Sequence, residues 1–283
     1  MLSQSTRYYV PQPSTYPIFG SFALLLMALG AASWFNGVGW GKYVTFTGMA
    51  VLFYMIAGWF STVAHESERG EYNKQVDGSF RWGMGWFIFS EVMFFGAFFG
   101  ALFYMRVLSV PDLGGLESQQ LIWPGFKPAW PTAGPGIAES FTPMAAWGLP
   151  ALNTLILLTS GATVTWAHWG LLKNNRSQLI WGLALTVLLG VMFITFQAIE
   201  YSHAYSELNL KLTTGAYGST FFMLTGFHGF HVTIGTIMLI VILFRSVAGH
   251  FKPEHHFGFE GVAWYWHFVD VVWLGLFIFV YWL

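Results

Sequence analysis

The sequence contains seven stretches that are nearly free of charged residues and long enough to cross a bilayer. They lie at 17–35, 43–64, 80–107, 143–172, 179–203, 215–247 and 259–283. A helix rises about 1.5 Å per residue, and the hydrocarbon core of a bilayer is about 30 Å thick. Backbone groups in lipid must be hydrogen-bonded within the chain, so these stretches are predicted to be helices rather than open sheets. We therefore predict an all-α, polytopic membrane bundle of seven transmembrane helices.

The composition supports a bilayer environment and excludes several classes of site. Hydrophobic residues make up 55% of the chain and charged residues 9%, against roughly 25% charged residues in soluble proteins. The sequence has no cysteine, which excludes disulfides, zinc fingers, thiolate copper sites and iron–sulfur clusters. The net charge of −1 says nothing about a nucleic-acid partner, and no basic cluster suggests one, so we predict none.

The distribution of lysine and arginine predicts the orientation in the membrane. One side carries Arg7, Arg69, Lys74, Arg81, Lys173, Arg176, Arg245 and Lys252, and the other carries Lys42, Arg106, Lys127 and Lys211. The richer side is expected to be cytoplasmic, which places the N-terminus inside and the C-terminus outside.

The predicted helices suggest three parts along the chain. Residues 1–16 form an inner-side N-terminal segment, which lacks the features of a signal peptide and is expected to be retained. Residues 17–64 form a two-helix N-terminal bundle, and residues 65–283 form a five-helix bundle. The long outer loop 108–142 is rich in proline and glycine, and we expect it to be ordered only by packing against something else.

Two carboxylates lie deep in predicted helices. Glu91 is about eleven residues into its span, roughly 16 Å along it. An ionised acid at this depth is costly, so we hypothesise that Glu91 carries a proton at neutral pH; alternatively it is a hydrogen-bonded structural acid that moves no proton. Asp270 has His267 three residues before it, with Trp266 and Trp273 on the same helix face. This pair is expected to satisfy itself as an internal polar contact.

Other polar residues in the predicted helices have structural interpretations. His228 and His231, with His267, are three imidazoles at similar depth, which a metal could use. Hydrogen bonds between helices explain them equally well, and we predict no metal. Glu200 is expected near the outer end of its helix, within reach of water or headgroups.

Positive and titratable residues gather on the inner side between the last two predicted helices. The segment FRSVAGHFKPEHHFGFE begins with Phe244 and carries Arg245 and His250. A cluster of this kind at headgroup level can hold a lipid phosphate by charge-assisted hydrogen bonds, although an ordinary positive-inside loop has a similar composition.

Four long stretches resemble one family. They are RWGMGWFIFSEVMFFGAFF (81–99), LNTLILLTSGATVTWAHWGLL (152–172), GSTFFMLTGFHGFHVTIG (218–235) and HHFGFEGVAWYWHFVDVVW (255–273). These stretches are similar to subunit III of haem–copper cytochrome c oxidases of the aa3 type. The five-helix subunit III of quinol oxidases is a weaker match, because this chain has two additional N-terminal helices.

The resemblance implies a fold and a set of site residues. It implies seven helices split two and five by a cleft filled with phospholipid. Glu91 falls on the family's buried acid, and Glu66 on an acidic position near a lipid headgroup. Arg245 and His250 match residues that face an anionic headgroup, and Trp59 belongs to the same lipid site. The chain has Tyr72-Asn73 where the family usually has His-Thr, which leaves that corner of the lipid site open.

The resemblance also implies a non-catalytic subunit of a proton-pumping oxidase. In such an enzyme, haem a and copper belong to partner subunits, and this chain contributes no catalytic residue. Its expected partners are subunit I, subunit II and phospholipids, with cytochrome c reached only through the assembled complex. The last four predicted helices are expected to face the partner, with Gly161, Ala162, Gly182 and Gly190 allowing close approach. We expect the bacterial cytoplasmic membrane, with the mitochondrial inner membrane as the alternative.

Two other functions remain open from the residues alone. The first is a free-standing seven-helix transporter of protons or ions that uses Glu91, Asp270 and His267 as a relay. The second is a membrane cytochrome that uses His228, His231 and His267 as ligands.

Overall fold

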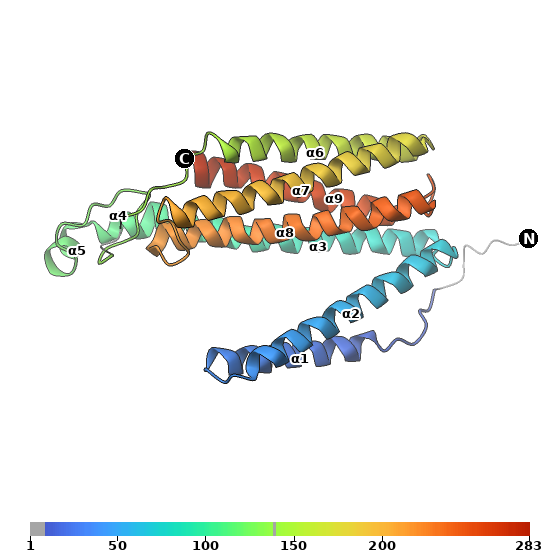
Figure 1. The fold of residues 1–283 in the computed structure, drawn as a ribbon, viewed down its shortest axis with the longest axis horizontal. Helices are drawn as coiled ribbons and strands as arrows, with labels where there is room; N and C mark the ends of the chain where they lie inside the picture. The colour runs from blue at the N-terminus through green and yellow to red at the C-terminus, as the bar shows by residue number, and fades with distance from the viewer. Residues whose placement is uncertain (1–8, 138–139) are drawn as a thin grey trace, which may run out of the picture. The chain divides into compact units, whose positions relative to one another are not determined.

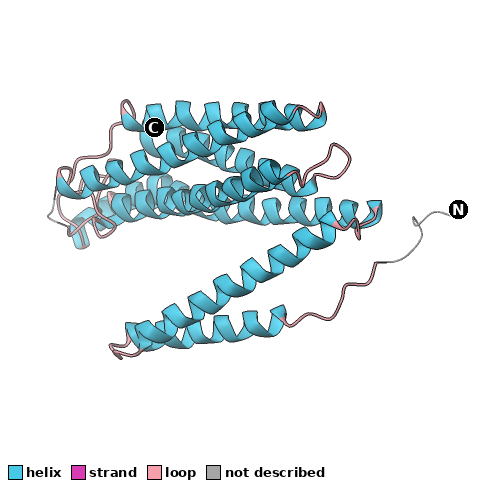
Figure 2. Ribbon diagram, turned by 45° about the vertical axis from the view of Figure 1, so that its right-hand side comes forward, coloured by secondary structure: helices cyan, strands magenta, loops and turns pink. Residues whose placement is uncertain are grey.

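The chain is helical through all of its long apolar stretches (Figure 1). A computed structural model describes residues 9–137 and 140–283. Within these residues, seven helices are long and apolar enough to cross a membrane. Figure 2 shows helices joined by loops, and the β pairing found in the described residues is one isolated bridge between Lys252 and His255. The prediction of an all-α bundle with seven membrane-spanning helices is confirmed.

The long helices are α1 (Tyr16–Phe35), α2 (Gly41–Glu68), α3 (Lys74–Phe103), α6 (Leu149–Leu172), α7 (Arg176–Ser206), α8 (Gly215–Ala248) and α9 (Phe257–Leu276). Short elements extend or connect them: η2 (Tyr104–Ser109), α4 (Val110–Leu113), α5 (Leu116–Leu121) and η3 (Phe277–Trp282). Both η elements are π-helical.

Several helix ends lie beyond the predicted ones, because polar residues continue the helices. The third span covers Lys74–Leu113 rather than 80–107, so the first part of the predicted loop 108–142 is helical. α7 begins at Arg176, directly after Asn175, whose side chain accepts a hydrogen bond from the backbone N–H of Gln178. Such a cap starts a helix without any apolar residue, and therefore hydropathy does not detect it.

The chain divides into two compact units, residues 1–80 and 81–283. In the first unit, α1 and α2 pack against each other as a hairpin (Figure 1). The residues these two helices bury are small: Gly20, Ala23, Gly30, Gly41 and Gly48. A Cβ on Gly48 would lie 2.8 Å from the carbonyl oxygen of Ala23, so glycine is needed for this approach. Small residues at a close helix contact are typical of membrane helices. The predicted division at 64/65 around a lipid cleft stays a prediction.

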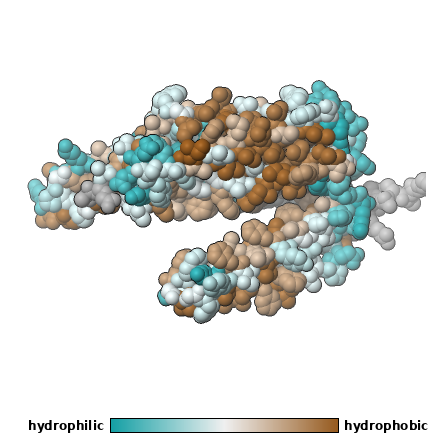
Figure 3. All heavy atoms as spheres, in the orientation of Figure 1, coloured by the Kyte–Doolittle hydropathy of each residue, from teal (hydrophilic) through white to brown (hydrophobic). Residues whose placement is uncertain are grey.

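The second unit has a core built from α6, α7, α8 and α9, which pack as consecutive neighbours with α9 also against α6. The α3 residues beyond position 80 join this core through aromatic rings; Phe95, for example, lies 6.1 Å from Phe268 between ring centroids. Figure 3 shows apolar side chains over the middle of these helices and hydrophilic ones toward their ends. An apolar exterior of this kind fits a bilayer, where lipid rather than water surrounds the helices.

Most of the small residues that we expected to contact a partner are instead buried in the core of the second unit. Gly161, Gly182 and Gly190 are buried inside the unit. A Cβ on Gly190 would lie 2.8 Å from the hydroxyl of Thr236 and 3.0 Å from the Trp266 ring. The expectation that these glycines allow a partner to approach is therefore wrong for all three, whereas Ala162 is exposed.

The loop after α5 packs against the N-terminal end of α8. The backbone N–H groups of Ala216 and Tyr217 donate to the carbonyls of Ala133 and Thr132. The rings of Trp130 and Phe141 lie 5.6 Å and 5.3 Å from the Tyr217 ring. These contacts pack the loop against the start of α8, in line with the expectation that packing against another element would order it.

Candidate functional site

Glu91 on α3 is paired with a histidine on α8. Its Oε2 lies 2.7 Å from Nε2 of His231. The other ring nitrogen, Nδ1, lies 2.6 Å from the backbone carbonyl of Phe227, to which it must donate because a carbonyl only accepts. Nε2 therefore either accepts a proton from a neutral carboxylic acid or, as part of an imidazolium, donates to a carboxylate. In both cases the pair has no net charge.

This neutrality explains why an acid is tolerated at the middle of the third span. Moving one proton between Glu91 and His231 changes where charge lies but not the sum, so no isolated ion faces the apolar surroundings. The rings of Phe94 and Phe95 lie 5.9 Å and 4.9 Å from the His231 ring and cover the pair. The proton that we predicted on Glu91 is therefore shared between the Glu91 carboxylate and the His231 imidazole.

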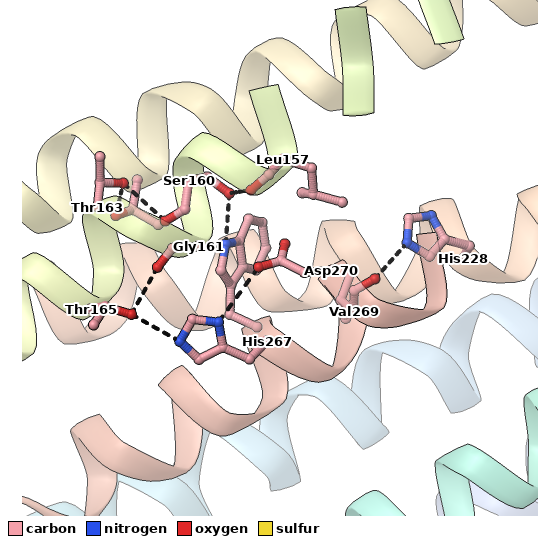
Figure 4. Close-up of polar contacts among 11 residues, drawn as sticks. Leu157, Ser160, Gly161, Thr163, Thr165, His228, His267, Val269 and Asp270 are labelled. Atoms are coloured by element: carbon pink, nitrogen blue, oxygen red, sulfur yellow. Dashed lines mark hydrogen bonds and ion pairs between the residues drawn. The ribbon is translucent and has the colours of Figure 1, made fainter. Parts of the chain in front are cut away.

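Asp270 lies on the side of α9 that faces α6 (Figure 4). Its Oδ2 is 3.6 Å from Nδ1 of His267, as the three-residue spacing predicts. Nε2 of His267 lies 3.2 Å from the hydroxyl of Thr165, which donates in turn to the backbone carbonyl of Gly161. Position 161 has no room for a side chain, because the Asp270 carboxylate occupies the place that a Cβ would take.

The two residues of this pair differ in environment. The Asp270 side chain is buried, whereas 46% of the His267 side chain is exposed. A cavity of about 510 Å³ opens here between α6 and α9, with Trp169, His267, Asp270 and Val271 among its lining residues. Lipid tails cannot hydrogen-bond to His267, so the imidazole depends on Thr165 and Asp270.

Two tryptophans hold α9 against α6 beside Asp270. Nε1 of Trp266 donates to the hydroxyl of Ser160 at 2.9 Å. Nε1 of Trp273 donates to the hydroxyl of Thr154, also at 2.9 Å. Both rings are fully buried. The helix face that was predicted to carry Trp266, Asp270 and Trp273 is therefore the face by which α9 packs against α6. His267 lies at the edge of this face.

The three imidazoles of α8 and α9 are not brought together. His228 donates from Nε2 to the backbone carbonyl of Val269 at 3.1 Å, and its ring lies 5.0 Å from that of Trp273. His231 bonds to Glu91, and His267 to Thr165. Since each ring points to a different partner, the geometry supports hydrogen bonds between helices over a shared metal.

The predicted environment of Glu200 is wrong. We expected water or headgroups within reach, but the side chain is 0% exposed. The hydroxyl of Tyr281 donates to Oε1 of Glu200 at 2.6 Å. α7 continues for six residues beyond Glu200 to Ser206, and η3 returns beside it. The sequence gives no signal for this contact, because the two residues are 81 positions apart.

Glu66 near the end of α2 accepts hydrogen bonds from two phenols in the first unit. The hydroxyls of Tyr9 and Tyr72 lie 3.0 Å and 2.6 Å from its Oε2. Burial and the neighbouring Glu66 raise the pKa of Tyr72 above its ordinary value, and the pKa of Tyr9 rises for the same reasons. Tyr9 and Tyr72 therefore share one carboxylate oxygen at the end of α2. Trp59, earlier on α2, is exposed and stacks on Phe60 with ring centroids 6.0 Å apart.

Arg245 and His250 lie at the C-terminal end of α8. Gly249 ends the helix with φ +93°, a left-handed conformation that favours glycine. The guanidinium of Arg245 lies 4.8 Å from the centre of the Phe251 ring, and Arg176 donates to the carbonyl of Phe251. The two arginines thus meet around one loop residue at this end of the bundle.

One cluster of polar residues was not singled out from the sequence. His168 on α6 lies 3.3 Å from His256, between their Nε2 atoms, and both lie near Glu260 on α9. Arg81 forms an ion pair with the same glutamate. The sequence signal is that Arg81, His168 and Glu260 lie at the inner ends of predicted helices, and that His256 belongs to the titratable inner-side segment before the last of them.

The chain matches the family model described as cytochrome c oxidase subunit III over residues 6–283. It is 42% identical to cytochrome c oxidase subunit 3 of Squalus acanthias over 283 residues, covering 100% of this chain and 99% of the relative. It is 42% identical to the protein of the same name from Prototheca wickerhamii over 97% of this chain and 96% of the relative. The corresponding protein of Marchantia polymorpha is 41% identical over 99% and 98%.

The chain belongs to the cytochrome c oxidase subunit III family. It is therefore an integral membrane subunit of an oxidoreductase complex of the respiratory chain. The resemblance drawn from the four sequence stretches is confirmed.

Proposed function

We propose that this chain is a non-redox subunit of a proton-pumping oxidase that passes electrons from cytochrome c to oxygen. Its role is to stabilise subunit I, to hold structural phospholipids and to support proton uptake by that subunit. The observation that carries this proposal is the local pairing of the deep acids. Glu91 is paired with His231, Asp270 with His267, and Glu200 accepts from Tyr281. Acids that each have a partner within the same unit suit a scaffold.

The lipid-binding part of the proposal rests on Glu66, Trp59, Arg245 and His250. Trp59 is an exposed indole of the kind found at the membrane interface. Arg245 is a cation at a helix end, which suits a phosphate. Glu66 already accepts two phenol hydroxyls, so we propose that it orients Tyr9 and Tyr72 at the lipid site and does not contact the lipid itself.

The remaining partners follow from membership of an oxidase complex. We propose that haem a and copper are held by partner subunits, that subunit I is the main contact and that subunit II lies within the same complex. Cytochrome c would be reached only through that complex. We propose the bacterial cytoplasmic membrane as its location, with the mitochondrial inner membrane as the alternative.

The pairing of acids also weighs against the two other functions. A relay through Glu91, Asp270 and His267 needs acids that exchange protons with one another, but Glu91 is engaged by α8 and Asp270 lies beside α6. A haem held by these histidines needs their rings to face a shared iron, whereas His228, His231 and His267 each point to a different partner.

The proposed function predicts what accompanies the chain during purification. A C-terminally tagged chain extracted in mild detergent should carry larger polypeptides that contain haem a and copper, together with phospholipid. The absorption spectrum of the preparation, metal analysis and lipid mass spectrometry measure these three components. A chain that purifies alone and transports protons in liposomes, or that binds a haem of its own, would contradict the proposal.

A further inference from the structure

Three buried polar side chains lie toward the end of the second unit at which α6 begins and α7 ends. Asn153 and Glu200 are 0% exposed, and Gln197 is 5% exposed. Both polar atoms of Asn153, both of Gln197 and Oε2 of Glu200 have no hydrogen-bond partner among the described residues. A buried polar atom without a partner loses its hydration and gains no bond in return. These five atoms therefore point to a partner from outside the chain.

The register of α6 against α7 places Asn153 beside Gln197. The two helices are joined by the short connection 173–175 and pack against each other as an antiparallel pair. The hydroxyls of Thr163 and Thr186 lie 2.8 Å apart and fix the register. Ten residues further from the connection, this register pairs position 153 with position 196, next to Gln197.

The same side chains point toward the contact between the two helices. Gln197 follows Thr186 by eleven residues, about three turns, so both lie on one face of α7. Asn153 precedes Ala167 by fourteen residues, about four turns, so these two also share a face of α6. Ala167 packs against α7 at Gly182, where an added Cβ would lie 2.7 Å from the Cβ of Ala167. Asn153 and Gln197 therefore face each other's helix.

Glu200 and Tyr281 close the group on the side of η3, which packs against α6. Glu200 is three residues after Gln197 and so shares its helix face. The hydroxyl of Tyr281 donates to Oε1 of Glu200 at 2.6 Å, which leaves Oε2 for another partner. The Gln197 amide lies beside the hydroxyls of Tyr201 and Tyr281, but not at hydrogen-bonding geometry. The polar atoms are thus enclosed by α6, α7 and η3.

We propose that Asn153, Gln197 and Glu200 bind internal water. Their five atoms include two amide nitrogens, which donate, and two amide oxygens, which accept, together with one carboxyl oxygen. Water both donates and accepts, and a buried water typically makes about three hydrogen bonds to polar groups that lack protein partners. A metal cation contacts oxygen atoms and would leave the amide N–H groups unpaired.

The bound water would supply a polar link at the far end of the α6–α7 pair. The described side-chain hydrogen bonds between these helices, from Thr163 to Thr186 and from Gln178 to the carbonyl of Trp166, lie nearer the connection. Water at Asn153 would join α6 to α7 and, through Glu200 and Tyr281, to η3. The competing arrangement is a direct hydrogen bond between the two amides without water.

The test is hydroxyl-radical footprinting of the detergent-purified complex that contains this chain. X-rays convert bound water into hydroxyl radicals, which modify the nearest aromatic side chains, and mass spectrometry gives the rate at each tyrosine. Tyr281 beside Glu200 is the reporter, at 7% exposure, and Tyr265, at 3%, is the matched control. Tyr281 is expected to be modified about threefold faster than Tyr265, or more.

Two variants remove polar atoms from the site. Asn153→Leu and Gln197→Leu should each slow the modification of Tyr281 to the rate of Tyr265. Thr195→Val is the control variant on α7 and should change neither rate, because the Thr195 hydroxyl bonds within its own helix. The haem content of each preparation shows whether the complex has assembled.

A cryo-electron microscopy map of the unmodified complex, at a resolution that shows ordered water, needs no variant. It should show density about 2.8 Å from polar atoms of at least two of the three side chains. Equal modification of Tyr281 and Tyr265 would overturn the proposal, as would an unchanged Tyr281 rate in both site variants. Direct bonding of the two amides in the map, or density at the shorter distance of a metal ion, about 2.4 Å, would also overturn it. These outcomes concern the interior of the chain and do not depend on its proposed role in the oxidase.

Discussion

Replacing His231 with leucine is expected to destabilise the chain by about 3 kcal/mol, the cost of an unpaired ionised carboxylate at the centre of a membrane helix. The structure gives Glu91 one described hydrogen-bond partner, Nε2 of His231 at 2.7 Å. Without this imidazole, the carboxylate either stays ionised among phenylalanine side chains or becomes a neutral acid. The O–H group of that neutral acid has no acceptor among the described residues. The first measurement is the thermal unfolding midpoint of the detergent-solubilised complex. The second is the temperature at which this chain is released from the complex.

Three companion variants separate the pairing from other roles of Glu91. Glu91→Gln should be nearly neutral, because an amide N–H can donate to Nε2 of His231 as a carboxylic acid does. Glu91→Leu should cost about 1 kcal/mol, since it leaves one polar atom of His231 unpaired. The double variant with leucine at both positions should be milder than His231→Leu alone. If Glu91→Gln is as damaging as His231→Leu, the carboxylate does more than satisfy its neighbour.

Replacing Trp266 with alanine should be the most damaging truncation in the core of the second unit. The Trp266 ring is 0% exposed and fills the space left by Gly190 and Gly235, to which its atoms lie close. Its loss removes these contacts and the hydrogen bond to Ser160, which should cost about 3–5 kcal/mol. The same thermal midpoint, together with the yield of assembled complex, measures the effect.

Trp264 provides a matched control on the same helix. It is two residues away, and 38% of its surface is exposed. Trp264→Ala removes the same number of atoms from a site that packs less against the chain, so its effect on the midpoint should be much smaller. Equal effects of the two substitutions would contradict the packing role given to Trp266.

Hydropathy predicted the membrane spans well because the bilayer imposes a simple rule on the sequence. A run of apolar residues must be helical and must be long enough to cross. The same rule fails at the helix ends, where polar residues such as Lys74 and Ser206 continue the backbone hydrogen bonds in water or among headgroups. Helix caps and side-chain contacts decide these ends, and hydropathy does not report them.

The polar pairs were predictable only when both partners lie on one helix. Asp270 and His267 are three residues apart, so their contact followed from helical spacing. Glu91 and His231 are 140 positions apart, and a single sequence does not say which faces of two apolar helices meet. Glu200 was misplaced for the same reason, because its partner Tyr281 belongs to the last element of the chain. Side chains that satisfy each other between helices therefore needed the structure.

The most direct test of a scaffolding role compares the oxidase with and without this chain. Reduced cytochrome c is supplied, and the reduction of haem a and the uptake of oxygen are followed over many turnovers. The depleted enzyme should reduce haem a and should start at a rate close to that of the complete enzyme. It should then lose activity sooner, because subunit I lacks its neighbouring helices and lipids. Failure to reduce haem a after removal of this chain alone would show that the chain takes part in electron transfer, and would contradict the proposed function.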